Sequence, residues 1–136
     1  MQSRVTHILF NIDGANQPFY RDFLAFVGYQ TLYDVPDMLG VGGAGGESLW
    51  FASGARPVTN DYDGPGVNHI ALSAASQTEV DSVVAYLTER GVPALFETPR
   101  HRPDFSESPE HTYYQVMFET PDRILIEVVY TGPLQP

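Results

Sequence analysis

The pattern of hydrophobic positions along this chain occurs twice, once in each half. In the first half, residues 4–11 read as a short strand, and the apolar residues after Asn16 are spaced for one buried face of a helix. Asn16 can cap that helix, and Gly28 suits the position just past its end. The runs 29–35, 38–41 and 47–53 predict three more strands, with the glycine-rich residues 42–46 as a flexible hairpin tip. The predicted helix face comprises Phe19, Phe23, Phe26 and Val27.

The same order restarts after a connector, residues 55–66, that is rich in Pro, Gly, Asn and Asp. A strand at 67–73 precedes Ser76 and Glu79, which form a capping box for a second helix ending at Gly91. The following runs predict three strands, at 93–97, 113–118 and 123–130. The second helix is predicted to have Val80, Val83, Val84 and Leu87 on one face.

Each half therefore reads strand–helix–strand–strand–strand. The two strand–helix units recur at one offset, which is what an internal repeat produces. We predict an α+β fold in which residues 1–136 form a single domain of two βαβββ modules, residues 1–54 and 67–130, joined by the connector 55–66.

The composition excludes several classes of function. The 136 residues carry 17 acidic and 7 basic side chains, a formal net charge of −10, so the basic surface that nucleic-acid binding needs is absent. There is no cysteine, which excludes disulfides and thiolate sites. No apolar run approaches the roughly 20 residues that span a bilayer, and the N-terminal residues do not resemble a signal peptide. A cytoplasmic protein with a small-molecule substrate is the expectation.

Three residues in apolar strand sequences are candidates for chemistry. His7 lies in the first predicted strand and His69 in the strand that opens the second half. Glu127 lies in the last strand, where alternation places Leu125 and Val129 on its own face. A carboxylate on an apolar face is costly unless it is paired, protonated or bound to a metal. Two histidines and one carboxylate are the ligand set of a facial metal triad, although a single strand histidine is more often structural.

These residues lie in segments that resemble the vicinal oxygen chelate superfamily, which includes glyoxalase I, extradiol dioxygenases, fosfomycin-resistance transferases and bleomycin-binding proteins. The segments are the opening strand with His7, the run 64–72 around His69, and the run 113–127 that ends in Glu127. The resemblance implies two βαβββ modules whose curved mixed sheets form a metal-binding cup. It also implies that His7, His69 and Glu127 are the metal ligands. Members of this size are commonly homodimers with sites near the interface.

Two departures from the family pattern matter. The closing turn is Thr120-Pro121-Asp122-Arg123 where the family usually has Asp-Pro-Asp-Gly, so a different turn or local strain is expected at Arg123. Glyoxalase I has a fourth ligand on the last strand of its first module, where this chain has Leu49, Trp50 and Phe51. We therefore expect an open three-ligand site, which argues against glyoxalase I itself.

Further residues are candidates for the same cup. By alternation, one of Tyr113 and Tyr114 should face the metal and could donate a hydrogen bond to substrate, while the other packs in the core. His101 could act as an acid or base, although an exposed loop histidine is the simpler interpretation. The other charged side chains of this polar loop, residues 98–111, are expected to be solvated. The substrate pocket is predicted to include Asn11, Trp50, Phe51, Ser73 and Arg100.

The ligand types suit Fe(II), Mn(II), Ni(II), Co(II) or Zn(II) and do not select among them. We predict a divalent-metal-dependent enzyme that acts on a small oxygen-bearing metabolite by bidentate chelation, with a dioxygenase favoured over an isomerase or lyase. Two alternatives stay open. One is a metal-free protein that binds a drug or metabolite, as bleomycin-resistance proteins do, and the other is a lyase similar to glyoxalase I.

Overall fold

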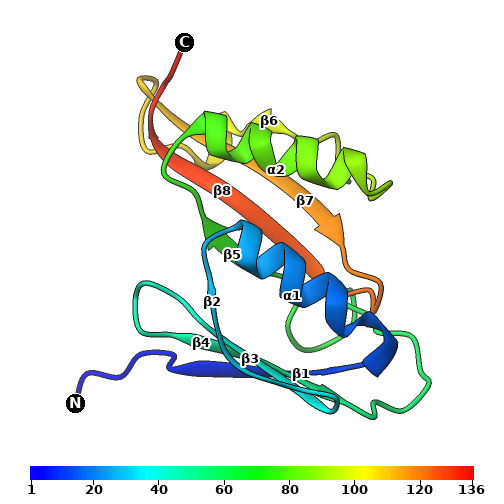
Figure 1. Cartoon of the computed structure of the whole chain (residues 1–136). Helices are drawn as coiled ribbons and strands as arrows, with labels where there is room; N and C mark the ends of the chain where they lie inside the picture. The colour runs from blue at the N-terminus through cyan, green and yellow to red at the C-terminus, as the bar shows by residue number, and fades with distance from the viewer. The chain divides into compact units, whose positions relative to one another are not determined.

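The computed structural model describes all 136 residues and divides them into two compact units (Figure 1). Unit 1 comprises Met1–Thr59 and unit 2 comprises Asn60–Pro136, so the boundary lies inside the predicted connector. Each unit has one long helix and one four-stranded mixed sheet. The predicted α+β class and the βαβββ order are confirmed. None of the helices is long and apolar enough to cross a membrane.

Unit 1 contains a sheet with the strand order β1-β4-β3-β2, in which β1 and β4 are parallel and the other pairs are antiparallel. Helix α1 buries its apolar stripe against this sheet, where Tyr20 stacks on Phe51 with a centroid distance of 4.5 Å. The elements are β1 (His7–Ile12), η1 (Gly14–Asn16), α1 (Gln17–Phe26), β2 (Gln30–Val35), β3 (Met38–Gly42) and β4 (Ser48–Ser53).

Unit 2 repeats this topology with the strand order β5-β8-β7-β6, in which β5 and β8 are parallel. Helix α2 packs on β7 and β8, and it begins at the predicted capping box, where the Ser76 hydroxyl accepts from the Glu79 N–H at 3.1 Å. The elements are β5 (Ile70–Ser73), α2 (Gln77–Glu89), β6 (Arg100–His101), η2 (Pro103–Phe105), β7 (His111–Glu119) and β8 (Leu125–Pro133).

The prediction of a strand at 93–97 is wrong. Phe96 and Glu97 adopt φ values of 56° and 60°, which lie in the left-handed region and end any extended run. The strand that pairs with β7 is instead the short β6, a few residues later. Neither residue is a glycine, so nothing in the sequence signals these conformations.

The start of α1 also differs from the prediction. The Asn16 side chain makes no capping hydrogen bond, and the Asp13 carboxylate instead accepts from the Ala15 N–H at 3.0 Å, which caps the short η1. Phe26, predicted on the buried helix face, is 46% exposed because it lies in the last turn of the helix.

Trp50 lies flat across the middle of the sheet in unit 1. Its indole N–H donates to the Ser48 hydroxyl at 2.9 Å, and its ring covers Gly40 on the neighbouring strand. A Cβ added at Gly40 would lie 2.3 Å from the Trp50 ring, so only glycine fits beneath it.

We therefore expect Gly40→Ala to lower the free energy of unfolding by about 1–3 kcal/mol, because the indole must leave its place or strain the strand. Urea unfolding followed by the fluorescence of this single tryptophan measures the change directly. Gly64→Ala is the control, since a Cβ there would meet its nearest atoms at an ordinary 3.5 Å. Equal stability of the two variants would contradict the packing argument.

Candidate functional site

Glu127 is a buried carboxylate at the centre of the sheet in unit 2. It is 2% exposed and lies on β8 between Ala71 of β5 and Met117 of β7. Its two oxygens have separate partners. The Tyr113 hydroxyl donates to Oε1 at 2.5 Å, and Nε2 of His69 lies 3.0 Å from Oε2. Sequence alternation predicted the apolar face, and the structure adds the two polar groups that contact the carboxylate.

The other nitrogen of His69 is held by its neighbour in sequence. Nδ1 lies 2.7 Å from Oδ1 of Asn68, and the Asn68 amide Nδ2 donates to the backbone carbonyl of Tyr62 at 3.0 Å. A carbonyl oxygen only accepts, so the amide nitrogen of Asn68 faces Tyr62 and its oxygen faces His69. Nδ1 of His69 therefore carries the hydrogen.

This assignment leaves the Nε2 lone pair of a neutral His69 directed at a carboxylate oxygen. Two acceptors 3.0 Å apart attract only if a positive centre lies between them. A proton would convert the pair into an imidazolium–carboxylate ion pair. A divalent metal ion would bind both atoms as ligands, and a histidine ligand in proteins typically donates its other N–H to an oxygen, as here. These two atoms are of the types that divalent transition-metal ions bind.

The Tyr113 hydroxyl keeps its proton at neutral pH. Burial, and then its hydrogen bond to Glu127, raise the pKa of Tyr113 to about 12. The ring of Phe105 packs edge-on against it at a centroid distance of 5.5 Å. At neutral pH the phenol is therefore a fixed donor that occupies Oε1 and leaves Oε2 to His69.

His7 opens β1 in unit 1, as His69 immediately precedes β5 in unit 2. Its Nδ1 lies 3.3 Å from the Thr6 hydroxyl, and its ring is exposed. The structure thus brings two of the three predicted ligands together, and no set of three or more His, Asp or Glu side chains is gathered so that it could hold a metal. Ligation by His7 stays a prediction.

The strand register shows which predicted pocket residues share a face with these histidines. In unit 2, Ser73, Val129, Gln115 and Arg100 form one row across the four strands, on the same face as Glu127. The Arg100 guanidinium contacts Glu97 at 3.2 Å, while its buried Nε has no partner. In unit 1, Asn11 and Trp50 lie on the His7 face, by the pairing of β1 with β4.

Three other predicted residues lie on the helix-covered faces instead. Tyr114 donates to Asp81 of α2 at 2.6 Å, so Tyr113 is the tyrosine that faces Glu127. His101 pairs in register with Tyr114, and its Nδ1 lies 2.5 Å from the Thr112 hydroxyl. Phe51 stacks with Tyr20 beneath α1 and is not part of a wall beside His7 and Trp50. Strand alternation causes each of these placements.

Two polar residues of the site were not predicted from the sequence. Asn68 was assigned to a strand at 67–73, but β5 begins at Ile70, so Asn68 can turn its amide onto His69. Gln115 is 3% exposed on the Glu127 face, and alternation from Tyr113 was the available signal for it.

Comparison with solved structures places this fold among known ones. A glyoxalase candidate from Bacillus halodurans matches 95% of this chain and 96% of its own, with a TM-score of 0.77 and 29% identity. A glyoxalase/bleomycin resistance protein/dioxygenase from Alicyclobacillus acidocaldarius matches 93% of this chain and 90% of its own, with a TM-score of 0.62 and 16% identity. The fosfomycin resistance protein FosX from Listeria monocytogenes, solved with Mn(II) and sulfate, matches 96% of this chain and 91% of its own (TM-score 0.68, 21% identity). At the last two identities, the likeness shows the fold alone.

Comparison of sequences is less extensive. The uncharacterized protein YqjT of Bacillus subtilis is 39% identical over 64 residues, which are 47% of this chain and 46% of that protein. The match therefore spans less than half of either protein. No family model matches the chain.

The tyrosine that faces the helix provides a test of the fold around the site. Burial, and then the hydrogen bond to Asp81, raise the pKa of Tyr114 from 10.0 to about 12. A raised pKa in the folded state means that the stabilisation is complete below about pH 10 and is lost as the pH rises toward 12. Tyr114→Phe removes that hydrogen bond and should lower the free energy of unfolding by about 1 kcal/mol at neutral pH.

The difference between the wild type and Tyr114→Phe should therefore shrink at alkaline pH. Urea unfolding followed by circular dichroism at a series of pH values measures it. Tyr33→Phe, at a half-exposed tyrosine of β2, is the matched control. A difference that stays constant up to pH 12 would show that the Tyr114–Asp81 bond does not stabilise the fold.

Proposed function

This chain has the fold of the vicinal oxygen chelate superfamily of glyoxalases, bleomycin resistance proteins and dioxygenases, and on that premise we propose that it is a divalent-metal-dependent enzyme. Its substrate in this proposal is a small metabolite with two adjacent oxygen atoms that chelate the metal. Fold alone does not select a reaction within such a superfamily, so the proposal depends on the site.

The observation that carries the proposal is the pairing of His69 with Glu127. The Nε2 lone pair of His69 and the Oε2 atom of Glu127 face each other at 3.0 Å, and the remaining atom of each group is already occupied. Tyr113 holds Oε1 and Asn68 holds Nδ1, so both free atoms are directed to one point. An imidazole and a carboxylate suit Fe(II), Mn(II), Ni(II), Co(II) or Zn(II).

We propose His7 as the third ligand. The support is the repeat, because β1 and β5 occupy the same place in two units of identical topology. Either the same chain or a second copy of it could supply His7, and a homodimer is part of the proposal.

When bound, the metal supplies Lewis-acid chemistry or a seat for O₂ activation. The residues around it would fix how a substrate enters. Arg100, with an unpaired Nε, is one of the few cations available to an anionic group. On the His7 face, Trp50 lies between exposed Leu9 and Tyr33, a surface that suits an aromatic or apolar substrate. An open set of two histidines and one carboxylate favours dioxygenase chemistry within this class.

Metal content is the first test. Protein purified without chelators should contain near-stoichiometric divalent metal by elemental analysis, and His7→Ala, His69→Ala and Glu127→Gln should each lose most of it. The physical reason is that each variant removes one of only three ligands. His111→Ala is the matched control, because His111 bonds to Ser108 and should leave the metal content unchanged.

Wild-type protein without metal, and unable to take it up on reconstitution, would overturn the enzyme proposal in favour of a metal-free binding protein. Loss of metal from the His69 and Glu127 variants but not from His7→Ala would reject His7 alone. Circular dichroism of each variant separates a lost ligand from a lost fold.

The reaction class is tested with the metal-loaded protein. We expect oxygen consumption with at least one member of a catechol panel and no turnover of methylglyoxal with glutathione, since the first module lacks the fourth ligand of glyoxalase I. Glu127→Gln is expected to abolish the oxygen consumption. Turnover of methylglyoxal with glutathione, without oxygen uptake, would replace the dioxygenase proposal by a lyase.

A further inference from the structure

We infer that Asn68 is a positioning residue that sets the tautomer of His69, and that a contact between the connector and the closing turn, residues 120–123, holds Asn68 in place. For its consequence on metal binding, this inference rests on the proposed function. The tautomer itself does not depend on it.

The first step is the orientation of the Asn68 amide. Its nitrogen donates to the Tyr62 carbonyl at 3.0 Å, which leaves only its oxygen to face Nδ1 of His69 at 2.7 Å. Because that oxygen accepts only, the neutral ring carries its hydrogen on Nδ1 and keeps Nε2 as a lone pair. A ring with the hydrogen on Nε2 would donate to Glu127 and could not bind a metal through that atom.

The second step is that Tyr62 is itself fixed. Its side chain is buried against Met117 and Leu125, and its hydroxyl donates to Glu119 at the end of β7. Because the ring is held, the Tyr62 carbonyl stays in place for Asn68.

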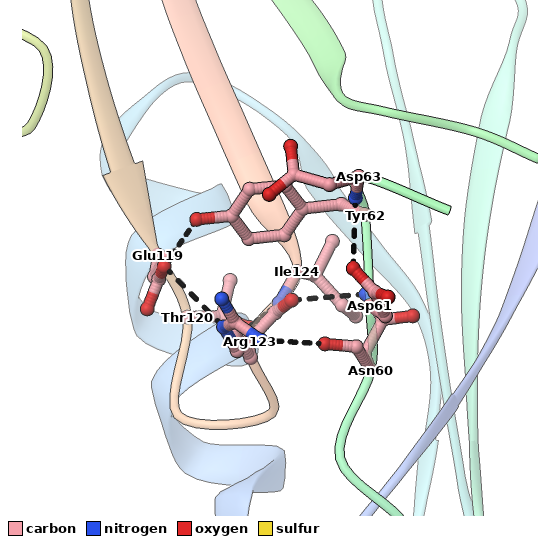
Figure 2. Close-up of polar contacts among 8 residues, drawn as sticks. All are labelled: Asn60, Asp61, Tyr62, Asp63, Glu119, Thr120, Arg123 and Ile124. Atoms are coloured by element: carbon pink, nitrogen blue, oxygen red, sulfur yellow. Dashed lines mark hydrogen bonds and ion pairs between the residues drawn. The ribbon is translucent and has the colours of Figure 1, made fainter. Parts of the chain in front are cut away.

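The third step is the closing turn, where Arg123 covers the Tyr62 ring. The guanidinium carbon lies 4.9 Å from the ring centroid, and a guanidinium nitrogen lies 3.6 Å from Glu119. The Arg123 guanidinium donates to the backbone carbonyl of Asn60 at 3.2 Å. The backbone carbonyl of Arg123 accepts from the side-chain amide of Asn60 at 2.9 Å. Figure 2 shows the connector residues and the turn joined by these contacts.

This arrangement accounts for the departure of the closing turn from the family pattern. Arg123 adopts φ 58°, a conformation in which glycine is unstrained and arginine is not. Glycine would relieve the backbone but would leave the Tyr62 ring uncovered. We infer that the strain is retained because the arginine side chain links the turn, through Tyr62 and Asn68, to His69.

The test compares the tautomer and the metal affinity in Asn68→Ala and Asn68→Asp. Long-range nitrogen–proton NMR of histidine-labelled, metal-free protein reports which nitrogen of the neutral ring carries the hydrogen. We expect hydrogen on Nδ1 in the wild type and in Asn68→Asp, which keeps the acceptor, and a shift toward Nε2 in Asn68→Ala. Calorimetric titration with Mn(II) should show affinity reduced roughly 10- to 100-fold in Asn68→Ala.

Arg123→Gly tests the link to the closing turn. It should weaken Mn(II) binding several-fold without an equal loss of thermal stability, because it removes the cover on Tyr62 while relieving the backbone. Arg90→Gly, at an arginine that contacts Tyr86 at the end of α2, is the control for loss of an arginine. Unchanged Mn(II) affinity in Arg123→Gly would remove the turn from the proposal.

An unchanged tautomer or an unchanged affinity in folded Asn68→Ala would overturn the role of Asn68. If that variant does not fold, Asn68→Asp is the deciding variant. Hydrogen on Nε2 of His69 in Asn68→Asp would also overturn the proposal. If wild-type protein binds no Mn(II) but the tautomer shifts as expected, the proposed function fails while the positioning of His69 by Asn68 is supported.

Discussion

The burial of one carboxylate is the constraint on which the site depends. Glu127 lies on the central strand pair of unit 2, almost without exposure, so each of its oxygens needs a partner. The Tyr113 hydroxyl donates to one oxygen, and the Nε2 lone pair of His69 faces the other, so that a positive centre is needed between them. Removing the Tyr113 hydroxyl would leave a buried carboxylate oxygen without its donor, which typically costs about 1–3 kcal/mol, so this contact also stabilises the sheet.

The connector is part of this arrangement and not a passive link between modules. Its residues from Asn60 onward belong to unit 2, where they pack on the end of the β7–β8 hairpin. The turn that joins these strands thus contacts Tyr62 through Arg123, while β8 carries Glu127. His69 is contacted by its sequence neighbour Asn68 and by Glu127, which is distant in the sequence.

The two units share a topology but differ in what they present on the open face of the sheet. Unit 2 presents a buried carboxylate, an amide at Gln115 and an incompletely paired Arg100. Unit 1 presents His7 beside an apolar row that includes Trp50, whose ring excludes any side chain larger than glycine at position 40. Corresponding sheet faces therefore carry mainly polar groups in unit 2 and an apolar row in unit 1.

The sequence by itself determined the order of the elements, the apolar face of Glu127 and the capping box at Ser76, because periodicity and local hydrogen bonding are properties of neighbouring residues. It also limited the site to one of Tyr113 and Tyr114. Only the tertiary structure decided that Tyr113 reaches Glu127, that Phe51 lies beneath α1, and that residues 93–97 turn instead of extending. Those outcomes depend on partners far away in the chain and on positive φ angles at residues that are not glycine. The role of Asn68 is of the same kind, since its orientation follows from the Tyr62 carbonyl, which is fixed by the distant closing turn.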